Sequence, residues 1–216
     1  MMSTLIRAIL AAAVCFVAGV GVTLALMPEK RPASLACRPS APQALATKEP
    51  ILVLGNSLAF DSDWQIDGKQ TVNCARQGLT VAAALPLIDE LPDIAPKSVV
   101  LVFGTVELVR DTADPEVFRS SLVKLVESLN AKYDPADIVV LGVPATGEDW
   151  SYDLADAKAL NRVIAEIDDV SMLSLDTVLA QQGSAAHYDG VHLTPSMYPS
   201  IWAALETHLA IDHAGD

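Results

Sequence analysis

The chain has 216 residues, of which 51% are hydrophobic and 5% aromatic, and its formal net charge at pH 7 is −13. This length suffices for one α/β domain and an appendage. A negative charge of this size would repel a phosphate backbone, so we expect no nucleic-acid partner and regard solubility as its main consequence.

The hydrophobic excess is concentrated at the amino terminus. Between Leu5 and Met27 the only polar residues are Arg7 and Thr23, and residues 8–27 form an apolar run about long enough to span a bilayer as a helix. We assign residues 1–31 to a membrane anchor, because no clean small-residue cleavage site follows the run; a cleaved signal peptide is the alternative. The anchor predicts a single-pass protein of a bacterial inner membrane with a periplasmic domain, and cleavage predicts a secreted protein.

Residues 32–49 contain prolines, alanines and serines, and we interpret them as a linker between the membrane and the domain. Cys37 lies in this linker and Cys74 lies in the domain. The two cysteines could form one disulfide outside the cytoplasm, where such bonds persist. Two separate buried thiols are equally compatible with the sequence.

From residue 50 to residue 216, short apolar runs alternate with helical patterns. The runs are continuous and rich in β-branched residues, as in strands buried on both faces. Asp114-Pro115 supplies the capping carboxylate and first-turn proline of a helix start. The alternation predicts one α/β domain with a parallel sheet covered by helices on both sides. The predicted strands are Ile51–Leu54, Thr71–Ala75, Val99–Phe103, Ile138–Val143 and Met172–Leu175; the predicted helices include Val81–Leu91, one opened by Asp114-Pro115 and a last one opened by Thr194-Pro195.

Two polar segments supply the residue types needed for acyl transfer. Gly55-Asn56-Ser57 directly follows the first predicted strand, and Asp189-Gly190-Val191-His192 precedes the last helix. Sites on parallel sheets form beyond the carboxyl ends of the strands, so we expect Ser57 at that edge. A serine becomes a nucleophile when a histidine removes its proton and a carboxylate orients the histidine. Taken alone, Ser57 could simply cap a helix, and Asp189 and His192 could lie on an exposed loop.

The order of these segments resembles that of the SGNH (GDSL-type) hydrolase superfamily, over residues 50 to about 210. The matching segments are Gly55-Asn56-Ser57, an isolated Gly78 after the second strand, Gly104-Thr105-Val106-Glu107 after the third, and Asp189-Gly190-Val191-His192. The resemblance implies a three-layer, flavodoxin-like fold. It implies Ser57 as nucleophile, His192 as general base and Asp189 as its orienting partner. The backbone N–H groups of Ser57 and Gly78 would then form the oxyanion hole.

Two positions depart from the pattern of that family. Asn56 stands where Gly-Asp-Ser is usual, and Val106 stands where Gly-x-Asn-Asp has its asparagine. Valine cannot donate the side-chain hydrogen bond that the asparagine gives to the oxyanion, and loss of one such donor can cost about a hundredfold to a thousandfold in rate. The possible pocket residues are Asn56, Gly104, Thr105, Val106 and Glu107, and the candidate replacement donors are Asn56, Thr105 and Asn73.

The sequence therefore predicts a serine esterase or acyltransferase that acts through an acyl-serine, with acetyl on a cell-envelope carbohydrate as the preferred substrate. Trp150 or Tyr152 could stack on a sugar ring, or could simply pack the loop after the fourth strand. We expect no cofactor, and no metal because the histidines lack partners at ligand spacing. The alternatives are an inactive SGNH-fold module that binds glycan or a partner protein, which Val106 would explain, and a lysophospholipase or thioesterase with the same triad.

Overall fold

The computed structural model describes residues 36–41, 49–62, 64, 66, 69–133, 137–180 and 186–212, all of which belong to the unit Ser34–Asp216. The predicted membrane anchor, 1–31, lies outside this part of the chain. Among the helices of the residues just given, none is long and apolar enough to cross a membrane.

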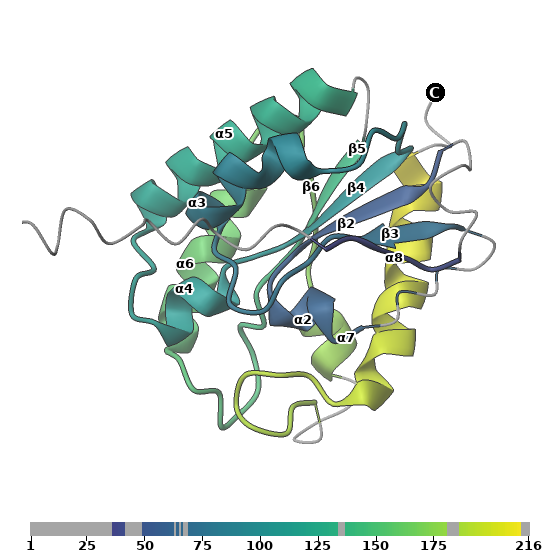
Figure 1. Cartoon of the computed structure of the whole chain (residues 1–216). Helices are drawn as coiled ribbons and strands as arrows, with labels where there is room; N and C mark the ends of the chain where they lie inside the picture. The colour runs from purple at the N-terminus through teal and green to yellow at the C-terminus, as the bar shows by residue number, and fades with distance from the viewer. Residues whose placement is uncertain are drawn as a thin grey trace, which may run out of the picture. The chain divides into compact units, whose positions relative to one another are not determined.

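The described residues form a six-stranded sheet in the order β1-β3-β2-β4-β5-β6 (Figure 1). All neighbouring pairs are parallel except the edge pair of β1 and β3. Because β2 lies between β3 and β4, the parallel strands follow the flavodoxin-like order, which confirms that prediction and sets a topological switch point between β2 and β4. The strands are β1 (Arg38–Pro39), β2 (Ile51–Gly55), β3 (Thr71–Asn73), β4 (Ser98–Val102), β5 (Asp137–Leu141) and β6 (Ser171–Leu173).

Alternate residues of each strand enter two separate cores, one on each face of the sheet. In β2, Leu52 and Leu54 pack into one core, and Ile51 and Val53 pack into the other. Helices cover both faces (Figure 1), so the molecule has the predicted three layers. The first core contains side chains of α3 (Val81–Ala84), α4 (Thr105–Val109), α5 (Pro115–Tyr133) and α6 (Leu154–Ala165), and the second contains those of α2 (Ser57–Phe60), α7 (Asp176–Ala180) and α8 (Tyr198–Asp212).

The predicted helix Val81–Leu91 is not a continuous α-helix. It consists of α3, which is four residues long, followed by the 3-10 helix η2 (Leu85–Glu90). Pro86 explains the change, because proline has no backbone N–H to donate to the carbonyl group four residues earlier. The helix start at Asp114-Pro115 is confirmed: α5 begins at Pro115, and Asp114 Oδ1 accepts hydrogen bonds from the N–H groups of Glu116 and Val117, at 2.9 and 3.0 Å.

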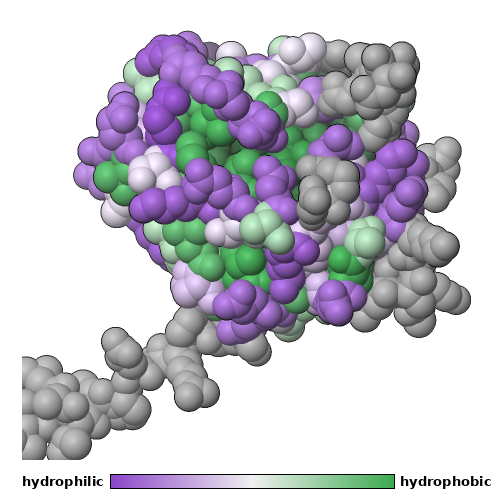
Figure 2. Space-filling model, turned by 90° about the horizontal axis from the view of Figure 1, so that it is seen from above, coloured by the Kyte–Doolittle hydropathy of each residue, from purple (hydrophilic) through white to green (hydrophobic). Residues whose placement is uncertain are grey.

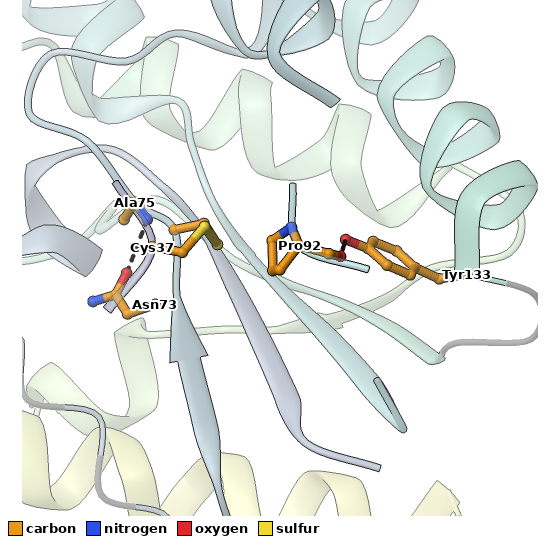
Figure 3. Close-up of a disulfide and its surroundings, with 6 residues drawn as sticks. Cys37, Asn73, Ala75, Pro92 and Tyr133 are labelled. Carbon is orange, nitrogen blue, oxygen red and sulfur yellow. Dashed lines mark hydrogen bonds between the residues drawn. A yellow bond between two sulfur atoms is a disulfide. The ribbon is translucent and has the colours of Figure 1, made fainter. Parts of the chain in front are cut away.

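Part of the predicted linker pairs with the sheet. A disulfide joins Cys37 to Cys74, and β1 pairs with β3 so that Arg38 lies opposite Asn73. Asn73 also ends β3, because its side-chain Oδ1 accepts a hydrogen bond of 2.9 Å from the Ala75 N–H (Figure 3). The disulfide that the sequence left open is therefore present, and it ties β1 to the loop that leads from β3 to Gly78. Thr194-Pro195, the predicted start of the last helix, opens the 3-10 helix η4 (Pro195–Met197), and the α-helix α8 itself begins at Tyr198.

Half of the chain is hydrophobic, and the hydrophobic residues of the described part are largely collected in the two cores. Figure 2 shows one face of the molecule, on which hydrophilic residues surround groups of hydrophobic residues.

Candidate active site

Ser57 is placed at the carboxyl edge of the sheet, next to the switch point. β2 ends at Gly55, and Asn56 caps α2 by accepting a hydrogen bond of 3.0 Å from the Leu58 N–H through Oδ1. Gly55 lets β2 approach β4 closely, because a Cβ at this position would lie 2.5 Å from the carbonyl oxygen of Val102. Ser57 is the first residue of α2, so its hydroxyl lies where ligands bind in this type of fold.

The structure brings together the three residues that the sequence predicts as a triad. His192 Nε2 lies 3.0 Å from Ser57 Oγ, and His192 Nδ1 lies 2.7 Å from Asp189 Oδ2. An ionised carboxylate only accepts hydrogen bonds, so Nδ1 carries the proton and Nε2 is left to accept the proton of the serine hydroxyl. This geometry matches that of a nucleophile, a general base and an orienting acid.

The carboxylate of Asp189 is held ionised by its own loop. Oδ1 accepts hydrogen bonds from the backbone N–H groups of His192, at 2.7 Å, and Val191, at 2.9 Å. Partial burial opposes ionisation, but these two bonds and the interaction with the imidazole outweigh it and lower the pKa of Asp189 to about 2. Asp189 can therefore orient His192 as an anion at any pH well above 2.

Residues that the sequence analysis did not assign hold this loop in place. His187 accepts a hydrogen bond of 3.1 Å from the Gly190 N–H at Nδ1, so its Nε2–H donates to the carbonyl oxygen of Glu148, 2.8 Å away. The Ser151 N–H donates to the Gly190 carbonyl oxygen at 2.8 Å. Gly190 has a φ of +77°, and a Cβ there would lie 2.5 Å from Ser151 Oγ. The proximity of His187 to Asp189 in the sequence was the one available signal for this role.

The predicted oxyanion hole is compatible with the position of Gly78. The Arg76 N–H donates to the Gly55 carbonyl oxygen at 2.9 Å, which fixes the loop before Gly78 beside the end of β2 and hence beside Ser57. Gly78 has a φ of +68°, which favours glycine. Neither the Ser57 N–H nor the Gly78 N–H donates to an acceptor within the described part of the chain, so both can face a substrate oxygen.

All three candidate replacement donors are buried. Asn73 Nδ2 donates to the carbonyl oxygens of Ala59, at 2.8 Å, and Ser62, at 3.4 Å, so it is committed to the fold. Asn56 is completely buried, and its Nδ2 has no hydrogen-bond partner among the described residues. Thr105 is also buried, with an exposed fraction of 2%. Val106 therefore leaves one position of the predicted oxyanion hole without any of these donors.

Glu107 has a structural position and is not a solvated loop carboxylate. Its Oε1 accepts a hydrogen bond of 2.8 Å from the Val81 N–H at the start of α3, and its Oε2 accepts one of 3.1 Å from the Gly104 N–H. Burial raises the pKa of Glu107, while these bonds and the positive charge of Arg110 act in the opposite direction. Glu107 thus joins the end of β4 to the helix that follows the Gly78 loop.

The aromatic side chains near the site divide into two kinds. Trp150 and Tyr152 use their polar atoms within the fold: Trp150 Nε1–H donates to the Thr146 carbonyl oxygen and the Tyr152 hydroxyl to that of Pro144, both at 3.0 Å. Tyr188, by contrast, is 63% exposed and stacks on His192, with ring centroids 5.9 Å apart. Loop packing therefore explains Trp150 and Tyr152, and Tyr188 is an exposed aromatic ring beside the imidazole that the sequence analysis missed.

A cavity at the opposite edge of the sheet is separate from this site. It has a volume of about 230 Å³, and its lining includes Ile51 and Ser98, the first residues of β2 and β4. The amino and carboxyl ends of parallel strands lie at opposite edges, so this cavity cannot receive a substrate of Ser57.

The sequence matches no protein-family model and no curated protein, but solved structures share the fold. They include a member of the lipolytic G-D-S-L family from Veillonella parvula (17% identical, TM-score 0.58, covering 72% of this chain and 95% of that one). They also include the esterase EstA from Pseudoalteromonas sp., which is 15% identical with a TM-score of 0.58, covering 76% of this chain and 100% of that one. A third is Est24, a carbohydrate acetylesterase from Sinorhizobium meliloti, which is 16% identical with a TM-score of 0.58, covering 76% of this chain and 99% of that one. The chain thus has the fold of the GDSL/SGNH lipases, esterases and acylhydrolases.

Proposed function

We propose that this protein is a serine esterase that cleaves or transfers an acyl group through an acyl-serine. The hydrogen-bonded series from Ser57 through His192 to Asp189 carries the proposal. Ser57 Oγ forms a bond to the ester carbonyl carbon while its proton moves to His192 Nε2. The carbonyl electron pair moves to the oxygen, which the N–H groups of Ser57 and Gly78 stabilise as an oxyanion.

The second half of the reaction uses the same residues. When the oxyanion collapses, the bond from carbon to the leaving alcohol breaks, and His192 Nε2–H donates its proton to that alcohol. Water, or a hydroxyl group in the case of transfer, then forms a bond to the acyl carbon and loses its proton to His192. When this second oxyanion collapses, the bond from the acyl carbon to Ser57 Oγ breaks, and His192 Nε2–H returns its proton to Ser57 Oγ. Asp189 stays ionised throughout and stabilises the imidazolium that forms twice in each cycle.

The substrate that we propose is an acetyl ester of a carbohydrate. The leaving alcohol must lie at His192 Nε2 to receive its proton, and the exposed ring of Tyr188 is stacked on that imidazole. An exposed aromatic face beside the imidazole suits a sugar ring. The carbohydrate acetylesterase among the similar structures supports the same substrate.

We also propose that the domain works outside the cytoplasm, held at a bacterial inner membrane by residues 1–31. The Cys37–Cys74 disulfide supports this location, because structural disulfides persist in oxidising compartments. Cleavage after the apolar run would release the same domain in secreted form.

The test is hydrolysis of a series of esters by the full-length chain and by Tyr188→Ala, with Tyr188→Phe as the matched control. We expect acetyl esters of sugars to be cleaved faster than long-chain acyl esters. Tyr188→Ala should lower kcat/KM for a sugar acetate about tenfold, about the value of one aromatic contact, and leave methyl acetate unchanged, whereas Tyr188→Phe keeps the ring and should behave as wild type.

Three outcomes would contradict parts of this proposal. Preference for long-chain esters would favour a lysophospholipase or thioesterase. Absence of turnover for every ester, together with binding of the intact carbohydrate, would favour the non-catalytic module that Val106 suggests. An equal effect of Tyr188→Ala on sugar acetate and methyl acetate would show that the ring does not contact the sugar.

A further inference from the structure

One charged side chain lies next to the loop that carries Gly78. Arg110 lies one helical turn after Val106, and its backbone N–H donates to the Val106 carbonyl oxygen at 3.1 Å. Residues four apart share one face of a helix, and side chains lean toward the helix amino terminus. The long side chain of Arg110 is therefore directed back over Val106.

The structure places the guanidinium of Arg110 against Gly78. A Cβ built on Gly78 would lie 2.8 Å from Arg110 Nη2. Gly78 is the residue whose N–H forms part of the proposed oxyanion hole. The guanidinium thus lies beside the hole, on the helix face from which the usual asparagine would have projected.

We propose that Arg110 is a catalytic residue that supplies the third donor of the oxyanion hole, in place of the asparagine that Val106 replaces. This inference rests on the proposed esterase function. A guanidinium carries five N–H donors and stays charged at any working pH. Hydrogen bonds from a charged donor to an anion are roughly twice as strong as neutral ones. Arg110 transfers no proton and forms no covalent bond. Its N–H donates a hydrogen bond to the carbonyl oxygen as negative charge develops on that oxygen.

Arg110 is exposed, and its neighbours include a carboxylate and a cavity. Its charge interacts with the carboxylate of Glu107, which is itself fixed by the N–H groups of Val81 and Gly104. Arg110 also borders a cavity of about 330 Å³, whose lining includes Thr80, Val81 and Glu107. This open side allows a second role to be tested, in which Arg110 binds an anionic group of the acyl chain and makes no contact with the oxyanion.

The experiment compares the full-length wild type with Arg110→Met, Val106→Asn and the double variant, on neutral p-nitrophenyl acetate. Lys124→Met, which removes an exposed charge from α5, is the control. We expect Arg110→Met to lower kcat about 10²- to 10³-fold with little change in KM, as for loss of one oxyanion donor. The rate of Ser57 labelling by a fluorophosphonate probe should fall in parallel, and Lys124→Met should change neither rate.

The double variant separates catalysis from folding. An asparagine at position 106 restores the donor that the family normally uses, so Val106→Asn should raise kcat at least about tenfold in the Arg110→Met background and less in the wild type. A kcat of Arg110→Met within about twofold of wild type on p-nitrophenyl acetate would overturn the proposal. The proposal would also fail if Arg110→Met only raised the KM for anionic esters. It would fail equally if Arg110→Met lowered Tm and the double variant showed no recovery of kcat. If the wild type itself showed neither turnover nor labelling, the esterase function would fail instead.

Discussion

At the scale of single residues, the imidazole of His192 is held at both ring nitrogens. Nε2 faces the Ser57 hydroxyl and Nδ1 faces a carboxylate with a pKa of about 2. In the proposed reaction, the carboxylate therefore stays charged while the histidine gains and loses its proton. The Asp189 carboxylate fixes the tautomer of His192 that leaves Nε2 free to accept the serine proton.

Replacing Asp189 by asparagine should remove that control. We expect Asp189→Asn to lower kcat for acetyl esters by about 10⁴-fold at neutral pH, as in other triads whose acid is amidated. The lowered pKa also predicts a stabilising contribution that is present above pH 3.8 and lost as the pH falls toward 2. Urea unfolding of the wild type between pH 5 and pH 2 should show this loss of stability, whereas Asp189→Asn should not show it. If the unfolding free energies of both proteins fell equally with pH, this expectation would be contradicted.

Glu107 is expected to contribute to the stability of the fold. Both of its carboxylate oxygens accept backbone hydrogen bonds, and a glutamine keeps only one acceptor. Glu107→Gln should therefore lower the free energy of unfolding by about 1–3 kcal/mol, the cost of one unpaired buried group. The exposed Glu116 in the first turn of α5 provides the control Glu116→Gln, which should change it little.

The raised pKa of Glu107 also determines whether this residue makes the free energy of unfolding rise or fall with pH. Above the ordinary value of 4.5 the unfolded chain loses the proton before the folded chain does. The contribution of Glu107 to wild-type stability should therefore decline as the pH rises above 4.5, and the difference in unfolding free energy between the wild type and Glu107→Gln should narrow over the same range. A difference that widens over this range would show that the carboxyl is stabilised as an anion.

At the scale of elements, the edge strand β1 supports the loop that carries Gly78. The disulfide joins residues 37 positions apart, and Cys74 lies four residues before Gly78. Loop-closure entropy for this separation predicts that the Cys37→Ser variant loses about 4 kcal/mol of stability. Urea unfolding of that variant, and of the wild type with and without dithiothreitol, checks the value. An unchanged unfolding midpoint would mean that the bond does not constrain the unfolded chain.

The elements also show which features the sequence alone can predict. Continuous β-branched runs identified all five parallel strands, because burial on both faces leaves a strong local pattern. β1 was missed, since a two-residue strand has no periodicity and forms only by pairing with the distant β3. The helix Val81–Leu91 was assigned too uniformly, because the effect of Pro86 was not included.

At the scale of the whole molecule, the sequence predicts the three residues that the structure brings together at the carboxyl edge of the sheet. Ser57 follows a buried strand, and in a doubly wound sheet the ends of β2 and β4 must form the binding edge. Arg110, His187 and Tyr188 could not be assigned in this way, because their roles depend on contacts between loops that are distant in sequence. Spacing along α4 carried a partial signal for Arg110, which lies one turn after Val106.

The central claim is that Ser57 attacks an ester through His192 and becomes acylated. The most direct measurement is mass spectrometry of the full-length protein after rapid mixing with p-nitrophenyl acetate and acid quenching. The account predicts a transient acetyl group on Ser57 in the wild type, its accumulation when deacylation is slowed, and its absence in Ser57→Ala and His192→Ala. Release of nitrophenol at the wild-type rate by Ser57→Ala, or an acetyl group that maps to another residue, would contradict the account.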